Sequence, residues 1–280
     1  RDGETGLFTG YYEPTLEGSL HADAEFSIPL YIRPASLISV NLGDFRQGLR
    51  GQRIAGRIKD GKLKPFSTRQ EIEAGALSGR GLELVWVNDL IGAFFLHIQG
   101  SGVIVLREGG VMRVGYDGQN GHPYRSIGRE LVRWGVLKRQ DVTMQSIRGW
   151  LKANPEHQSD VFNHNKSYIF FRKIFTEGPI GAQNVVLTPQ RSLAVDLSHI
   201  SLGIPIWVDI RVPNLEGPDK EWQRLMVSQD TGGAIRGVIR GDVFWGAGAF
   251  AGEIAGRMKH NGQYYVLLPR SVKNEILFKF

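Results

Sequence analysis

The chain has 280 residues, of which 41% are hydrophobic and 22% are charged, so it has the composition of a globular protein with one large domain or two smaller ones. It contains no cysteine, which excludes disulfides, thiolate nucleophiles and cysteine-ligated zinc, and no apolar run approaches the roughly 18 residues that a membrane-spanning helix requires. Its net charge of +6 favours anionic partners, such as a cell-wall polymer, a membrane surface or nucleic acid, although no dense Lys/Arg run is present.

The N-terminal part is predicted to form short extended segments. Residues 10–14 (GYYEP) are turn-rich and aromatic, and residues 27–32 have the pattern of a strand with a proline at its edge. A capping box at Thr68-Arg69-Gln70-Glu71 then predicts a short helix that ends near residues 75–79.

Four strand-like segments follow, at residues 82–87, 93–98, 103–106 and 111–116. The connections between them are short and rich in Gly, Asn and Asp, which predicts an antiparallel meander. Two helices come next, one capped by Ser126 and one capped by Thr143 that ends before Asn154-Pro155.

Short strands return from residue 184 onward. Residues 204–212 alternate apolar and polar side chains, which predicts a half-buried strand, and residues 225–228, 242–245 and 264–268 fit further strands. The glycine-rich segment 246–252 has the wrong spacing for a dinucleotide site and is predicted to form a close turn.

The sequence offers no conventional metal or phosphate site. The seven histidines are scattered without zinc-ligand spacing, and the chain has neither a Gly-x-Ser-x-Gly elbow nor a phosphate-binding loop. We therefore expect no metal and no cofactor.

Three aspartates stand in apolar, small-residue surroundings. Asp196 follows a strand-like segment, Asp230 opens DTGGAI and Asp242 opens DVFWG. Partial desolvation raises the pKa of such a carboxyl, which suits a general acid. For any one aspartate taken alone, however, the sequence favours a structural role in a turn.

A second polar cluster lies on two glycine-rich segments, residues 97–102 and 115–125. They combine amides, hydroxyls, aromatic rings and Arg125. This mixture suits sugars, because rings cover their apolar faces while amides and guanidinium groups bond their hydroxyls. Two ordinary hairpin loops explain the same composition equally well.

Taken together, these segments resemble the membrane-bound lytic transglycosylase A family, whose members cleave bacterial peptidoglycan. The matching segments run in family order over nearly the whole chain: residues 8–14 (FTGYYEP), 99–102 (QGSG), 116–128 (YDGQNGHPYRSIG), 165–171 (NKSYIFF), 193–196 (LAVD), 229–237 (QDTGGAIRG) and 242–246 (DVFWG).

The resemblance implies a mainly β fold. A double-psi β-barrel, similar to barwin and a class of endoglucanases, would be built from residues 1–39 and 173–280, with the so-called three-Asp region at about 190–270. A β-rich second domain with a few helices, residues 40–172, would be inserted, and the glycan would bind in a groove between the two.

The resemblance also implies site residues. Asp242 would be the catalytic acid and base, with Asp230 as its supporting residue. We expect the glycan to contact Tyr12, Gln99, Ser101, Gly102, Tyr116, Asn120, Gly121, Tyr124, Arg125, Asp196, Thr231, Gly232 and Trp245. Two positions depart from the family pattern: Gly241 stands where a larger residue is expected, and Ser201 where proline is expected.

The implied reaction is the cleavage of the β-1,4 bond between N-acetylmuramic acid and N-acetylglucosamine without water, which forms a 1,6-anhydro ring. Two main alternatives remain open at this stage, and a third is weaker. One is a hydrolase of the same barrel type, with Asp230 and Asp242 as base and acid. The other is a non-catalytic module that binds cell-wall glycan, and a nucleic-acid binder is the weakest option.

The expected setting follows from the same resemblance. The partner would be peptidoglycan glycan strands and not nucleic acid, and the protein would act in the periplasm. The family name implies attachment to the outer membrane through a segment absent from this chain, and we expect a monomer.

Overall fold

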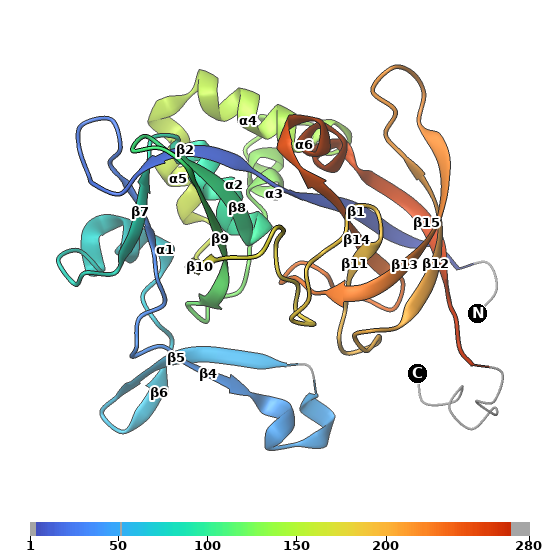
Figure 1. Cartoon of the computed structure of the whole chain (residues 1–280), viewed down its shortest axis with the longest axis horizontal. Coiled ribbons are helices and arrows are strands. Elements are labelled where there is room, and N and C mark those ends of the chain that lie inside the picture. The colour runs from blue at the N-terminus through green and yellow to red at the C-terminus, as the bar shows by residue number, and fades with distance from the viewer. Residues whose placement is uncertain (1–3, 51, 270–280) are drawn as a thin grey trace. The chain divides into compact units, whose positions relative to one another are not determined.

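The computed structural model describes residues 4–50 and 52–269 of the chain (Figure 1). The chain divides into two compact units. The barrel unit combines residues up to Tyr12 with those from Ile180 onward, and the insert unit runs from Glu13 to Pro179.

The barrel unit is built from strands and one helix. Its elements are β1 (Gly6–Glu13), β11 (Ser192–Val195), β12 (Pro205–Val212), β13 (Lys220–Asp230), β14 (Arg240–Ala247), α6 (Gly248–Arg257) and β15 (Lys259–Val266).

The insert unit mixes strands and helices. Its strands are β2 (Thr15–Ser19), β3 (Ile28–Tyr31), β4 (Ile38–Asn41), β5 (Arg53–Lys59), β6 (Lys62–Lys64), β7 (Glu83–Val87), β8 (Ser101–Leu106), β9 (Val111–Gln119) and β10 (Ile169–Ile174). Its helices are α1 (Arg69–Glu71), α2 (Leu90–Gln99), α3 (Ile127–Arg133), α4 (Met144–Ala153) and α5 (Gln158–Asn163), with short helical turns η1 (Leu42–Asp44), η2 (Gln47–Leu49), η3 (Ile72–Ala76), η4 (Arg139–Asp141) and η5 (Pro155–His157).

Six strands close into a barrel in the order β1-β14-β11-β13-β12-β15, and β1 pairs with β15 to complete the ring. Figure 1 shows the blue N-terminal strand β1 lying among the orange and red C-terminal strands. The alternation predicted for residues 204–212 is confirmed, because Ile206, Val208, Ile210 and Val212 of β12 are all buried. The barrel therefore joins the two ends of the sequence, as the resemblance implied.

The insert unit contains a six-stranded sheet in the order β10-β9-β8-β2-β7-β3 and a separate three-stranded sheet, β4-β5-β6. Strands β2 and β3 fall in the range 1–39 that we assigned to the barrel, yet they pair with β7 and β8. Leu16 and Leu30 explain this placement, since both are buried in the apolar core of that sheet.

Residues 93–98, predicted to be a strand, belong to helix α2, so this prediction is wrong. The Asp89 side chain caps the helix by accepting a hydrogen bond from the Gly92 backbone N–H (2.8 Å). One side of α2, including Leu96, packs on the sheet, and another, including Phe94, packs on helices α3 to α5. A helix that is apolar on several sides has no clear 3.6-residue period, which is why it reads as a strand.

The three predicted helix starts are confirmed. Backbone N–H groups donate to the side-chain oxygens of Thr68, Ser126 and Thr143 at the starts of α1, α3 and α4. The turn predicted at 246–252 is only partly right, because α6 begins at Gly248. None of the helices in the described part of the chain has the length and apolar character needed to cross a membrane.

Candidate active site

Asp230 and Asp242 lie on either side of the same residue in the barrel. Strand β11 runs between β13 and β14, and Ala194 pairs with Asp230 on one side and with Asp242 on the other. With neighbouring strands about 4.8 Å apart, the two aspartate Cα atoms are about 10 Å apart. Because Ala194 contributes only a methyl group, no large side chain of β11 separates the two carboxyl groups.

Asp242 is half-buried and has a strongly perturbed pKa. The Thr9 hydroxyl donates to Asp242 Oδ1 at 2.6 Å, and Arg240 Nη2 donates to Thr9 Oγ1 at 2.8 Å. Burial raises the pKa of Asp242 to about 6, against the opposing effects of the Arg240 charge and the Thr9 hydrogen bond, and Asp230 adds to the rise. This carboxyl can therefore hold a proton near neutral pH and also release it.

Asp230 is fixed by three hydrogen bonds. Its Oδ1 accepts from the backbone N–H groups of Thr231 (2.9 Å) and Ala182 (3.0 Å), and its Oδ2 accepts from the Tyr11 hydroxyl (2.8 Å). Burial raises the pKa of Asp230, and these hydrogen bonds oppose the rise. Burial and the neighbouring Asp230 raise the pKa of Tyr11, so its hydroxyl remains a donor.

Asp196 is buried, and its carboxylate accepts hydrogen bonds from two separate segments of the barrel unit. Its Oδ1 accepts from the backbone N–H and the hydroxyl of Ser198, and its Oδ2 accepts from the Gly237 N–H at 2.8 Å. Burial raises its pKa, but these hydrogen bonds and the Arg236 charge outweigh it, so the pKa of Asp196 is lowered. The carboxylate thus links the segment after β11 to the segment before β14.

The other expected barrel residues are used in packing or backbone contacts. Trp245 is buried and its Nε1 donates to Met258 Sδ at 3.2 Å. Tyr12 is buried beside Gly252, Thr231 donates its hydroxyl to the Val195 carbonyl, and Gly232 accepts from the Ile235 N–H.

Gly241 is explained by its neighbour Phe8. A Cβ atom at Gly241 would lie only 2.7 Å from Cε1 of the Phe8 ring, which is fully buried. The space that a larger residue would fill is therefore occupied from β1, and Gly241 leaves Asp242 in place in β14.

Asn120, expected to contact glycan, is completely buried and holds three backbone segments together. Its Nδ2 donates to the carbonyls of Ser67 and Lys166, both at 2.9 Å, and its Oδ1 accepts from the Tyr168 N–H at 2.9 Å. Oδ1 also accepts a longer hydrogen bond from the His122 N–H (3.4 Å), so both donors and both acceptor sites of the amide are used within the protein.

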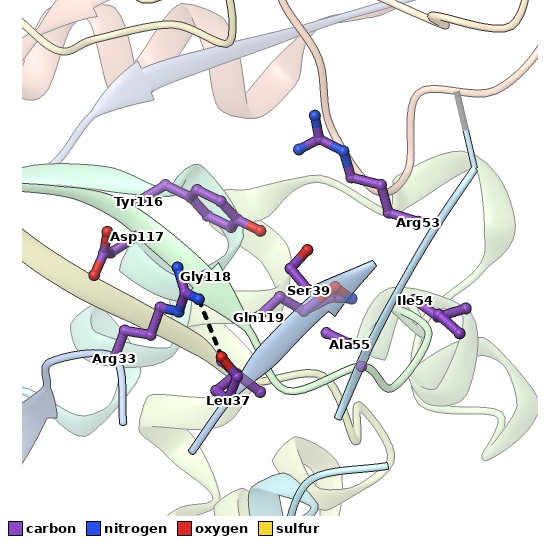
Figure 2. Close-up of a pocket in the computed structure, with 11 residues that line it drawn as sticks. Arg33, Leu37, Ser39, Arg53, Ile54, Ala55, Tyr116, Asp117, Gly118 and Gln119 are labelled. Carbon is purple, nitrogen blue, oxygen red and sulfur yellow. Dashed lines mark hydrogen bonds between the residues drawn. The ribbon is translucent and has the colours of Figure 1, made fainter. Parts of the chain in front are cut away.

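The remaining expected residues of the insert unit lie in and between α2, β8, β9 and α3, and Ser101 pairs with Gly115, the neighbour of Tyr116. Gln99 ends α2, Ser101 begins β8, and Gly102 is buried against Leu96 and Pro14. Tyr124 is half-buried and Arg125 is exposed, both just before α3. Tyr116 and Gly121 line a pocket between β9, β4 and β5, shown in Figure 2.

Sequence reasoning did not select Thr9, Tyr11 or Arg240, which surround the two aspartates. The usable signal was the two-residue spacing of Thr9 and Tyr11 in β1, since alternate residues of a strand face the same side. Within residues 4–50 and 52–269, no group of three or more His, Cys, Asp or Glu side chains could hold a metal ion.

Comparison with known families identifies the chain. The model described as the MltA specific insert domain matches residues 7–172, which is more than half of the sequence, and the model described as the 3D domain matches residues 191–268. The chain belongs to the MltA family. The resemblance drawn from the sequence motifs is therefore confirmed.

The similar curated proteins are named membrane-bound lytic murein transglycosylase A. The one from Vibrio cholerae is 31% identical over 268 residues, and the one from Escherichia coli K12 is 34% identical over 266 residues. Each alignment covers 93% of this chain but 65% of the relative, so the chain spans about two thirds of the relatives' length.

Solved structures of the MltA family share the fold. A membrane-bound lytic murein transglycosylase from Agrobacterium tumefaciens has a TM-score of 0.85 and 38% identity, covering 95% of this chain and 74% of that one. E. coli MltA with bound chitohexaose has a TM-score of 0.78 and 32% identity, covering 94% of this chain and 71% of that one. The expected double-psi β-barrel is confirmed.

Proposed function

We propose that this MltA-family chain is a lytic transglycosylase that cleaves the β-1,4 bond between N-acetylmuramic acid and N-acetylglucosamine in peptidoglycan. The observation that carries the proposal is the Asp242 carboxyl, half-buried in the barrel, with its pKa raised to about 6. The names of the curated relatives and the chitohexaose bound to E. coli MltA support a glycan substrate.

Asp242 acts first as a general acid. Its neutral carboxyl donates a proton to the glycosidic oxygen as the bond from that oxygen to C1 of the muramic residue breaks. The leaving sugar departs as an alcohol, and positive charge develops at C1. General acid assistance of this kind contributes roughly 10²–10⁴-fold to the rate.

The same group then acts as a base. The Asp242 carboxylate accepts the proton of the C6 hydroxyl of the muramic residue while its oxygen attacks C1. The product is a 1,6-anhydro ring, and Asp242 ends the cycle protonated. An internal nucleophile held in position needs no second carboxylate to activate water, because effective molarities for such groups are high.

Asp230 supports Asp242 through its charge. The negative charge of Asp230 favours the protonated form of Asp242, which contributes to the raised pKa. Its own hydrogen bonds from Tyr11 and two backbone N–H groups hold that charge in place. We assign Asp230 this positioning role and leave proton transfer to Asp242.

Two other functions make different product predictions. A hydrolase with Asp230 as base and Asp242 as acid would leave reducing ends; inverting enzymes of this kind hold their carboxyls about 6.5–9.5 Å apart. A non-catalytic module would bind peptidoglycan and release nothing.

The test is mass spectrometry of soluble products after the protein is incubated with peptidoglycan sacculi. We expect 1,6-anhydromuropeptides from the native protein and from the control Asp209→Asn, whose carboxylate lies on the partly exposed face of β12. Asp242→Asn should release at least 10²-fold less. Reducing-end products would favour the hydrolase, and full activity of Asp242→Asn would refute the assigned role.

The cellular setting is also a proposal. The relatives are named membrane-bound, and we propose that this protein acts on glycan strands in the periplasm, attached to the outer membrane through a segment outside these 280 residues. We propose that it works as a monomer without a cofactor or nucleic acid. Membrane fractionation of the full-length protein and light scattering would test the location and the oligomeric state.

A further inference from the structure

The insert unit contains a pocket of about 190 Å³ beside strand β9 (Figure 2). Tyr116 and Gln119 line it from β9, Ser39 lines it from β4 and Arg53 from β5, and Arg33 lies between β3 and β4. Figure 2 shows the Tyr116 phenol and the Ser39 hydroxyl between the two arginines, with the Arg33 guanidinium on one side and Arg53 on the other. The pocket therefore combines hydrogen-bonding groups from separate strands.

Two glycines allow these strands to approach one another. A Cβ atom at Gly121, where φ is +85°, would lie 1.9 Å from the Ala55 carbonyl oxygen, and one at Gly118 would lie 3.1 Å from Arg33 Cδ. A side chain at either position would disturb the wall of the pocket. The wall of the pocket thus depends on the glycines of the segment 116–121.

The two arginines give the pocket its charge. Arg33 Nη2 donates to the Leu37 carbonyl at 3.0 Å, which fixes its orientation, and neither Arg33 nor Arg53 forms an ion pair with any described residue. Asp117 also lines the pocket, but Figure 2 shows it beyond Arg33, on the side away from Arg53. Two guanidinium groups against one carboxylate leave a net positive charge.

Tyr116 lies within the field of both arginines. Tyr116 is 51% exposed, and its partial burial raises its pKa, whereas the charges of Arg53 and Arg33 lower it. The hydroxyl is therefore protonated at neutral pH and adds a donor beside the two cations. Planar guanidinium groups with an adjacent hydroxyl suit a carboxylate, which accepts several charge-assisted hydrogen bonds at once.

We propose that this pocket binds a carboxylate of the stem peptide of peptidoglycan. The inference rests on the proposed function for the choice of substrate, and it adds that this chain discriminates peptide-bearing glycan from bare glycan. Arg33 and Arg53 are exposed to solvent, so the preference comes from bonding geometry: a carboxylate accepts paired charge-assisted hydrogen bonds from a guanidinium, whereas a neutral sugar hydroxyl accepts single, weaker ones. The pocket volume of about 190 Å³ is large enough for one amino-acid residue.

The experiment is calorimetric titration of the native protein with a matched pair of ligands. The first is N-acetylmuramyl-L-alanyl-D-glutamate whose γ-carboxyl is capped as a methylamide, which leaves the α-carboxylate free. The second has both carboxyls capped. We expect the first to bind about tenfold or more tightly than the second.

Variants locate the binding. Arg53→Gln and Tyr116→Phe should weaken binding of the free carboxylate by about tenfold and about threefold, and should leave the capped ligand unaffected. The control Arg80→Gln changes an exposed arginine of the same unit outside the pocket and should alter neither. Thermal melts would confirm that all three variants fold.

Several outcomes would overturn the inference. The first two are equal binding of the two ligands and unchanged binding of the free carboxylate by Arg53→Gln. Displacement of the ligand by inorganic phosphate at the same concentration would indicate a general anion site. Equally tight binding of free N-acetylmuramic acid would assign the pocket to the lactyl carboxylate.

The two proposals can fail separately. If the native protein releases no anhydromuropeptides but binds the ligand in an Arg53-dependent manner, the proposed reaction is wrong and the pocket assignment stands. If anhydromuropeptides form and Arg53→Gln binds normally, the reaction stands and the pocket assignment is wrong.

Discussion

Thr9 and Asp242 are 233 positions apart in the chain, yet the Thr9 hydroxyl donates a 2.6 Å hydrogen bond to Asp242 Oδ1. The contact exists because β1 and β14 are neighbours in the closed barrel. It holds one oxygen of the proposed acid and stabilises its ionised form. Closure of the barrel therefore determines both the orientation and the pKa of Asp242.

Thr9→Val should change the pH dependence of the proposed reaction. The hydrogen bond from Thr9 lowers the pKa of Asp242, so its loss raises that pKa above about 6. Because the first step needs protonated Asp242, kcat/KM falls as pH rises through this pKa. We expect the falling limb to move to higher pH by about one pH unit.

The measurement is the initial rate of anhydromuropeptide release between pH 4.5 and 8. Thr15→Val is the matched control, because Thr15 is exposed in β2 and should leave the profile unchanged. A limb that stays in place or moves to lower pH in Thr9→Val would contradict the role given to this hydrogen bond.

Asp242→Asn should make the protein more stable at neutral pH. The pKa of Asp242 in the folded protein, about 6, exceeds its ordinary value of 3.8, so the folded state binds the proton more tightly than the unfolded chain. The free energy of unfolding therefore falls as pH rises from about 4 to about 6. Asparagine cannot ionise, and we expect a gain of about 1–3 kcal/mol at pH 7.5.

Urea denaturation at pH 4 and pH 7.5 measures this effect. The gain should shrink at pH 4, where Asp242 is mostly protonated in the native protein. An equal effect of Asp242→Asn at both pH values would show that ionisation of Asp242 is not its cause.

Asn120→Ala should destabilise the insert unit instead of weakening glycan binding alone. The substitution removes two donors to the carbonyls of Ser67 and Lys166 and one acceptor for the Tyr168 N–H. Leaving these buried groups without partners should cost about 2–5 kcal/mol. Urea denaturation measures this loss of stability, and Asn261→Ala, which changes an exposed asparagine, is the control. A variant of native stability that fails to bind glycan would restore the role predicted from the sequence.

Gly241→Ala should cost about 1–3 kcal/mol of stability, because the new methyl group would overlap the buried Phe8 ring. A smaller residue at position 8 should relieve the overlap, so adding Phe8→Leu should make the two effects non-additive. A double-mutant cycle by thermal or urea denaturation tests the coupling. Fully additive effects would show that Phe8 is not the reason for glycine at this position.

Local sequence signals correctly predicted the elements that depend on contacts within one short segment. Side-chain caps at Thr68, Ser126 and Thr143 depend on contacts within three residues, and the alternation in 204–212 depends on one strand. Helix α2 was missed because its apolar surface is buried by a sheet and by other helices, which are distant in the sequence. The pattern of a segment shows that it is buried but not what buries it.

The sequence by itself determined the family resemblance, the barrel class and the three aspartates, because these depend on residues in fixed order along short motifs. The tertiary structure decided which polar side chains of the motifs can react and which are engaged in structural hydrogen bonds. It placed Asp230 and Asp242 on either side of Ala194, and it committed Asp196 and Asn120 to backbone hydrogen bonds. A pKa or a free donor depends on burial and on partners from distant segments, and only the folded chain brings those together.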